Sequence, residues 1–208
     1  MLQFLQLYCD FAPPESMNET ETPPLSRQQV LVAMGATALL LGAIAKLWIW
    51  LGRVQLMPAT WHPLELLAGV GLGLAIVGLS RLLYWLWPRY RTCAEQYMTT
   101  IVQPLAWPDL IWLGLLPSVS EELLFRGVAL GAFGLTPLAI ALTSIAFGSL
   151  HLMDLKQWPY GIWAMVIGAL FGTSLLLTGN LLVPIVSHSV ANLLSSYLWK
   201  HRWVGQNS

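Results

Sequence analysis

A few polar side chains in an apolar part of the sequence have the types and spacing needed for hydrolysis. Residues 120–127 are Ser-Glu-Glu-Leu-Leu-Phe-Arg-Gly, so Glu121, Glu122 and Arg126 lie within the apolar run 110–138. An ionised group at the centre of a bilayer costs about 2.5–3.5 kcal/mol on insertion scales. Three such groups in one stretch must therefore pair with one another or serve a function.

The helical phase separates the two carboxylates. Residues four apart share one face of a helix, so Glu122 and Arg126 are expected to pair. Glu121 points about 100° away from Glu122 and stays available for chemistry. The phase thus predicts a supporting pair and a separate reactive carboxylate.

Two later apolar stretches carry the remaining polar groups at the same spacing. Phe147 and His151 lie four apart in the stretch 138–153, and His188 and Asn192 lie four apart in the stretch 181–199. Each pair shares one helix face. We expect Glu121 to face His151, His188 and Asn192 near the middle of the bilayer.

A carboxylate, two imidazoles and a carboxamide form a hydrolytic set. The carboxylate accepts a proton from water, and one histidine orients that water. The second histidine and the asparagine donate hydrogen bonds to a developing oxyanion. The residues alone leave three alternatives open: a structural Glu–Arg pair in an adaptor, a proton relay in a transporter, and a zinc site. The candidate zinc ligands are Glu121, His151 and His188, although H-E-x-x-H and G-x-S-x-G are absent.

The composition indicates an integral membrane protein. Of the 208 residues 56% are hydrophobic and 10% are charged, whereas soluble domains carry about 25% charged residues. The net charge of zero gives no basic field for nucleic acid. Cys9 and Cys93 are far apart and form no CxxC pair, which indicates neither a disulfide scaffold nor a thiolate metal site.

The hydropathy pattern predicts an all-α transmembrane bundle of about six spans. We expect a polar leader at 1–29, two spans and an interfacial segment at 30–107, a catalytic four-helix core at 108–199, and a cytoplasmic tail at 200–208. The predicted spans are residues 30–51, 64–87, 108–133, 138–153, 160–177 and 181–199. Residues 89–107 are the longest internal polar segment and predict an amphipathic helix along the interface.

Glycine and proline add local detail to two of these spans. Gly69, Gly71, Gly73 and Gly78 would let a neighbouring helix approach the second span closely. Pro117 lies one turn before Glu121 and is expected to loosen the hydrogen bonds there.

The lysine and arginine distribution predicts that both termini are cytoplasmic. Six spans place the termini and the second and fourth loops on one side of the membrane. That side collects most of the basic residues outside the core motif: Arg27, Arg81, Arg89, Arg91, Lys156, Lys200 and Arg202. The other side has only Lys46 and Arg53.

The three motifs together resemble those of a known protease family. Glu121-Glu122-x-x-x-Arg126, Phe147-x-x-x-His151 and His188-x-x-x-Asn192 are similar to the motifs of the CAAX protease and bacteriocin-processing (CPBP) family, which includes the type II CAAX prenyl endopeptidases. The resemblance covers about residues 110–199, with each motif on its own predicted span.

The resemblance implies an intramembrane endopeptidase that uses a glutamate-activated water and needs no cofactor. Glu121 would be the general base, His151 would help to activate the water, and His188 and Asn192 would form the oxyanion site. Three residues would support them: Glu122, Arg126 and Phe147. Six spans are typical of the compact bacterial form, so we expect a peptide or a membrane-protein segment as substrate, at a bacterial inner membrane. Some family members act as scaffolds or immunity factors, which keeps a non-enzymatic role as the alternative.

Overall fold

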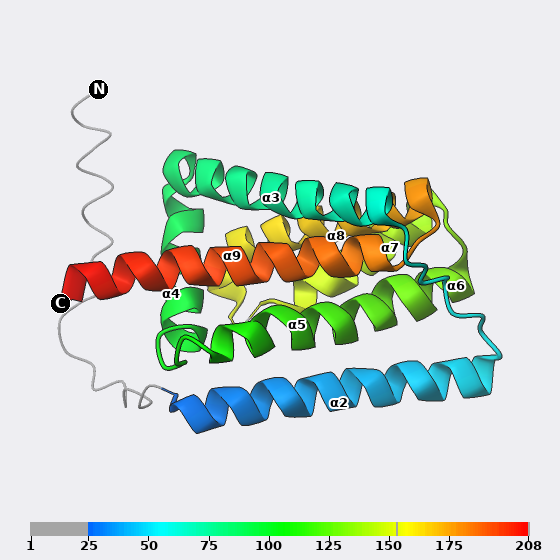
Figure 1. The fold of residues 1–208 in the computed structure, drawn as a ribbon, viewed down its shortest axis with the longest axis horizontal. Coiled ribbons are helices and arrows are strands. Elements are labelled where there is room, and N and C mark those ends of the chain that lie inside the picture. The colour runs from blue at the N-terminus through cyan, green and yellow to red at the C-terminus, as the bar shows by residue number, and fades with distance from the viewer. Residues whose placement is uncertain (1–24, 153, 208) are drawn as a thin grey trace.

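Every secondary-structure element in the described part of the chain is a helix. The computed structural model describes residues 25–152 and 154–207, and its helices form an elongated bundle (Figure 1). This confirms the predicted all-α class. Most of the predicted leader, residues 1–24, lies outside the described residues.

The first two long helices match the first two predicted spans. Helix α2 (Arg27–Gly52) begins three residues earlier than predicted, because Ser26 and Gln29 form a capping box. Its C-cap residue is Arg53, whose φ of 48° is left-handed. Helix α3 (Pro63–Leu86) begins with Pro63 at its first turn, where the missing N–H costs nothing.

Length and composition mark three helices in the described part of the chain as candidate membrane spans. They are α2, α3 and the stretch Leu155–Thr178, which contains α8 (Trp158–Thr178), and α7 (Pro137–Leu150) is apolar but shorter. Large apolar side chains cover the outside of the first two, as with Leu39 at 78% and Leu67 at 65% exposure. A helix with an apolar outer face is stable where lipid replaces water.

Helix α4 (Pro88–Ile101) crosses one end of the bundle at a steep angle to the long helices (Figure 1). It occupies the segment predicted as an interfacial helix. Its partners include α3 and α8, and Glu95 on it is paired with Arg202 near the carboxyl end of α9 (Leu182–Asn207). Its position fits the predicted interfacial location.

The predicted span 108–133 is a continuous helical segment that contains a π-helix. It contains α5 (Asp109–Glu122), the π-helix η1 (Leu123–Ala129) and α6 (Leu130–Phe133). The sequence predicted loosened hydrogen bonds near Pro117, but Pro117 lies inside regular α-helix. The irregular hydrogen bonds are those of the π-helix, which begins at Leu123. Wide π turns of this kind are frequent at functional sites, and this one directly follows Glu122.

Two predicted helix ends need correction. Helix α7 stops at Leu150, so His151 is its C-cap residue and not part of a span that reaches 153. Helix α9 continues to Asn207, through the segment predicted as a tail. The helix is extended there because Lys200 donates to the carbonyl oxygens of Val102 and Gln103 and Arg202 pairs with Glu95.

Two of the four glycines in α3 bring it against α9. A Cβ atom on Gly69 would lie 2.9 Å from the Val183 carbonyl oxygen, and one on Gly73 would lie 2.7 Å from the Ser187 carbonyl oxygen. Gly71 and Gly78 have nothing within 4 Å of that position, so the expectation of close packing is wrong for these two. The close approach sets the place of α9, which carries His188 and Asn192.

The connection between α2 and α3 is fastened at the end of the bundle away from α4. Asn180 accepts from the Thr60 N–H at 3.0 Å and donates to the Thr60 carbonyl and to Glu65. The Met57 N–H donates to the Gly127 carbonyl in the π-helix at 3.1 Å. These bonds join the loop to η1 and to the turn before α9, which carry or border the candidate site.

Candidate active site

A fully buried ion pair forms the centre of the site. Arg126 Nη1 donates to Glu122 Oε1 at 3.0 Å, and both side chains have 0% exposure. The predicted pairing is therefore present. Arg126 Nη2 donates to the Gly168 carbonyl of α8 at 2.7 Å, and a Cβ on Gly168 would lie 3.0 Å from that nitrogen. A glycine at 168 thus gives the guanidinium access to the backbone of α8.

Aromatic rings enclose the guanidinium of Arg126. Its Cζ lies 4.5 Å from the ring centroid of Phe147, 5.5 Å from that of Phe171 and 5.8 Å from that of Phe125. Cation–π contacts of this kind offset part of the desolvation of a buried charge. The rings also exclude water, so the direction of the Glu122–Arg126 pair is fixed by its protein surroundings.

His188 shares the carboxylate of Glu122. Its Nδ1 lies 2.9 Å from Glu122 Oε1, so the ring N–H donates to the carboxylate. The imidazole stacks on Phe171, with ring centroids 5.0 Å apart. The sequence predicted that His188 would face Glu121. In the structure α9 instead places its Nδ1 against Glu122, so this prediction is corrected.

Glu121 and His151 face each other without a direct hydrogen bond. Glu121 Oε2 lies 3.7 Å from His151 Nε2, beyond hydrogen-bond range. It is buried and has no hydrogen-bond partner in the described part of the chain. His151 Nδ1 lies 2.8 Å from the Phe147 carbonyl oxygen, so Nδ1 carries a proton, and in the neutral ring Nε2 has a lone pair. The two facing atoms are therefore both proton acceptors.

Phe147 holds His151 from two sides. Its carbonyl binds the imidazole, and its ring centroid lies 4.6 Å from that of His151. The same ring contacts the Arg126 guanidinium. Phe147 therefore links the buried ion pair to the histidine beside Glu121.

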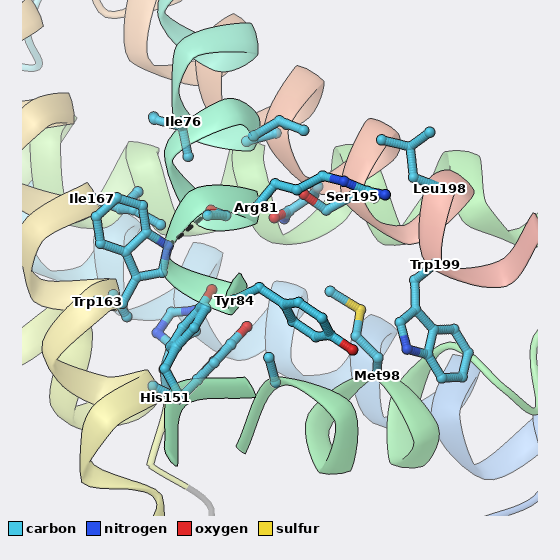
Figure 2. Close-up of a pocket in the computed structure, with 18 of the residues that line it drawn as sticks. Ile76, Arg81, Tyr84, Met98, His151, Trp163, Ile167, Ser195, Leu198 and Trp199 are labelled. Atoms are coloured by element: carbon cyan, nitrogen blue, oxygen red, sulfur yellow. Dashed lines mark hydrogen bonds between the residues drawn. The ribbon is translucent and has the colours of Figure 1, made fainter. Parts of the chain in front are cut away.

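Two cavities meet at the candidate catalytic residues. The α3 cavity, about 160 Å³, is lined by α3, α4, α8 and α9 and contains His188. The α2 cavity, about 240 Å³, is lined by α2, α4, α5 and α9 and contains Glu121. His151 and Asn192 line both cavities. Figure 2 shows the α3 cavity, with His151 and Trp163 at one side of the view and Leu198 and Trp199 at the other.

Several residues at the site lie outside the three motifs, and the sequence did not predict them. Tyr97 on α4 and Tyr160 on α8 stack with their centroids 4.7 Å apart, and both line the α2 cavity with Glu121. Gly168 and Phe171 hold Arg126 and His188. Aromatic residues and glycines are common in membrane helices, so only the three-dimensional packing identifies these.

The candidate zinc ligands do not form a three-ligand group. No cluster of three or more His, Cys, Asp or Glu side chains suited to a metal ion occurs in residues 25–152 and 154–207. His188 directs Nδ1 to Glu122, and His151 directs Nδ1 to a backbone carbonyl. These contacts leave Nε2 as the free nitrogen of each ring, and the side chains of Glu121, His151 and His188 are not gathered into one three-ligand group in the described part of the chain.

Comparisons with known proteins match the part of the chain that holds the site. Residues 103–194 match the family model described as "Type II CAAX prenyl endopeptidase Rce1-like". The "Uncharacterized protein YpbD" of Bacillus subtilis (strain 168) is 37% identical over 83 residues, which cover 40% of this chain and 41% of that protein. The chain thus matches less than half of its curated relative. No solved structure matches.

The matched segment contains all three motifs. It begins before α5, includes Glu121, Phe147 and His151, and ends two residues after Asn192. The family match and the apolar helices indicate an integral membrane protein. The resemblance predicted from the motifs is confirmed: residues 103–194 match the Rce1-like type II CAAX prenyl endopeptidase family model, which is consistent with the wider CAAX protease and bacteriocin-processing family.

Proposed function

We propose that this protein is an intramembrane endopeptidase that hydrolyses a peptide bond with a water molecule activated by Glu121 and His151. The observation that carries the proposal is the facing pair of proton acceptors, Glu121 Oε2 and His151 Nε2, 3.7 Å apart at the meeting point of two cavities. A water molecule between them would donate one hydrogen bond to each. The Rce1-like match over this region supports the same reaction class.

Glu121 is the proposed general base. Its Oε2 has no hydrogen-bond partner among the described residues, so the lone pair is available to a water proton. His151 orients the same water through Nε2, while the Phe147 carbonyl fixes the ring. Positioned proton transfer contributes typically about 10²–10⁴-fold to rate.

His188 and Asn192 are the proposed oxyanion donors. Both line the α3 cavity and come from successive turns of α9. With Nδ1–H donated to Glu122, His188 donates through Nε2 only when the ring carries both protons. Glu122 then accepts from the imidazolium. One preorganised oxyanion donor contributes about 2.7–4 kcal/mol to transition-state stabilisation.

Glu122, Arg126 and Phe147 are the proposed supporting residues. Glu122 accepts from both Arg126 and His188 through the same oxygen. Phe147 connects Arg126 to His151. Their role is to hold the acid–base and oxyanion groups in place, since a displacement of about 1 Å costs roughly 10²-fold in rate.

The proposed substrate is a peptide or a segment of a membrane protein, and the proposed location is a bacterial inner membrane. Both termini lie on the cytoplasmic side in this proposal, because the start of α2, the end of α9 and helix α4 share the end of the bundle that holds most basic residues (Figure 1). The catalytic groups named above need no cofactor to move the protons.

Cleavage of a peptide library by the purified protein in detergent tests the proposal. The parent is expected to cleave members that Glu121→Ala and His188→Ala leave intact. His201→Ala, an exposed histidine on the same helix as His188, is the matched control and should cleave like the parent. Equal cleavage by all four proteins, or no cleavage by the parent across the library, overturns the proposal. Retention of all cellular function by Glu121→Gln would instead support the adaptor alternative.

A further inference from the structure

The two cavities differ in which catalytic group they expose. Glu121 lines the α2 cavity and not the α3 cavity, whereas His188 lines the α3 cavity and not the α2 cavity. His151 and Asn192 belong to both. Glu121, the proposed proton acceptor, and His188, one of the two proposed oxyanion donors, therefore line separate cavities.

Addition to a carbonyl requires this kind of separation. The water oxygen forms its bond at the carbonyl carbon from one face, and its proton passes to Glu121. The carbonyl π electrons move to the oxygen, which needs donors on another side, here His188 and Asn192. When the intermediate collapses, the C–N bond breaks and the nitrogen takes the proton. Water thus arrives from the Glu121 side and the carbonyl oxygen points to the His188 side.

The α2 cavity has the polar groups that water needs. Hydroxyl groups of Thr37, Tyr97, Ser120 and Ser196 line it together with the Glu121 carboxylate. A buried water needs two to four polar partners and about 30 Å³ of space. The cavity volume of about 240 Å³ holds several such molecules. Its lining includes Leu25, an exposed residue beside the start of α2.

The α3 cavity has the walls that an apolar peptide side chain needs. Ile76, Val77, Ala164 and Ile167 line it from α3 and α8. Arg81, Glu95 and Arg202 also line this cavity. Apolar side chains such as Val30 and Leu113 line the α2 cavity as well, so the two cavities are distinguished by Glu121 and His188 and not by overall polarity. Burial of an aliphatic side chain on such walls stabilises the complex.

We propose that the α3 cavity binds the peptide substrate, with an apolar side chain beside the cleaved bond, and that the α2 cavity supplies the attacking water. The inference rests on the proposed protease function and assigns a separate task to each cavity. Bulk added to the α2 cavity should slow hydrolysis without weakening substrate binding. Bulk added to the α3 cavity should weaken binding.

Two filling variants test this assignment. Ala38→Phe fills the α2 cavity from α2, and Val77→Phe fills the α3 cavity from α3. Leu39→Phe and Leu74→Phe are the matched controls, because both leucines are exposed on the outside of the same helices at 78% and 50%. The readouts are kcat and KM for a peptide with an apolar side chain at the cleaved bond. The Kd of that peptide is measured on each variant combined with Glu121→Gln.

The two variants should change different constants. Ala38→Phe is expected to lower kcat about tenfold with Kd within about twofold of the parent, and Val77→Phe to raise Kd and KM about tenfold with kcat within about threefold. The controls should match the parent. A rise in Kd for Ala38→Phe, a loss of kcat alone for Val77→Phe, or equal effects of both overturns the assignment.

Folding and function are separated by further measurements. If thermal unfolding shows that a variant is not folded, Ala33→Phe replaces Ala38→Phe and Ile167→Phe replaces Val77→Phe, since they line the same cavities. A parent that cleaves nothing contradicts the proposed function itself. A parent that cleaves, with variants that do not divide as stated, contradicts only the cavity assignment.

Discussion

Adjacent glutamates have different surroundings at the scale of single residues. Glu122 has 0% side-chain exposure and one carboxylate oxygen bound by both Arg126 and His188. Glu121 is 15% exposed and faces His151 across 3.7 Å. One step along the helix therefore separates the proposed structural carboxylate from the proposed reactive one. The difference predicts opposite consequences for the same chemical change.

Glu122→Gln should destabilise the protein far more than Glu121→Gln. Loss of one partner of a buried ion pair leaves an uncompensated charge and costs about 3–5 kcal/mol. Glu121 has no ion pair closer than 3.7 Å, so its amide variant should stay within about 1 kcal/mol of the parent. Thermal unfolding of the three proteins in one detergent checks this. Equal destabilisation by both variants would show that Glu122 is not the structural member.

The contact between α3 and α9 positions two site residues at the scale of helices. Gly73 lies against the Ser187 carbonyl and Val190, within one turn of His188. Gly71, two residues away on the same helix, has open space at its Cβ position. Gly73 is therefore the position to substitute, and Gly71 is its matched control on the same helix.

Gly73→Val should move α9 and weaken both stability and cleavage. The new side chain would overlap backbone and side-chain atoms at 2.7–2.8 Å, and such overpacking costs typically about 1–3 kcal/mol. Gly71→Val makes the same chemical change without the overlap and should leave cleavage near the parent level. Unfolding temperature and cleavage rate are measured for both. Similar losses in the two variants would point to a general effect of valine in α3.

Glu95 joins helix α4 to α9 through its ion pair with Arg202. Its carboxyl group lies outside the spanning helices. Burial raises the pKa of the Glu95 carboxyl, but hydrogen bonds from Tyr84 and Trp199 and the charge of Arg202 outweigh it, so the pKa lies below its usual value. A lowered folded-state pKa stabilises the protein above the carboxyl's unfolded pKa. The contribution is lost as the pH falls through the folded pKa.

Glu95→Gln should therefore lower the unfolding temperature near neutral pH and not in acid. Its side chain is 34% exposed, so solvent screening limits the expected loss to about 0.5–1 kcal/mol. The difference from the parent should shrink as the pH falls through the lowered folded-state pKa of Glu95. Unfolding curves across this range measure it. A difference that stays constant with pH would mean that the charge of Glu95 does not attach α4.

The features that the sequence predicted correctly follow from the local spacing of apolar and polar residues. The features that it missed depend on how the helices pack against one another. The apolar runs located α2, α3 and α8, and the four-residue spacing found the Glu122–Arg126 pair. The π-helix at Leu123–Ala129 and the contact of His188 with Glu122 depend on how helices cross. A single-helix phase carries no information about crossing, so these features required the structure.

The arrangement of helix ends makes a prediction at the scale of the whole molecule. Helix α4, the start of α2 and the end of α9 lie at one end of the bundle (Figure 1). Arg27, at the start of α2, binds Asp109 at the start of α5 with distances of 2.6 and 2.8 Å. The proposed cytoplasmic side is this end.

Reporter fusions in a bacterial host test the orientation. A green fluorescent protein at the carboxyl terminus should fluoresce, and an alkaline phosphatase there should be inactive, because the first folds in the cytoplasm and the second outside it. Phosphatase inserted in the loop between α2 and α3 should be active. The reverse pattern would place the termini on the other side and contradict the basic-residue argument.

The catalytic role of Glu121 is the central claim, and single-turnover cleavage of one substrate in proteoliposomes tests it most directly. Glu121→Gln should lower the cleavage rate by about 10²–10⁴-fold while the substrate Kd and the unfolding temperature stay near those of the parent. His201→Ala should cleave at the parent rate. A Glu121→Gln protein that binds the substrate and cleaves it as fast as the parent would contradict the account.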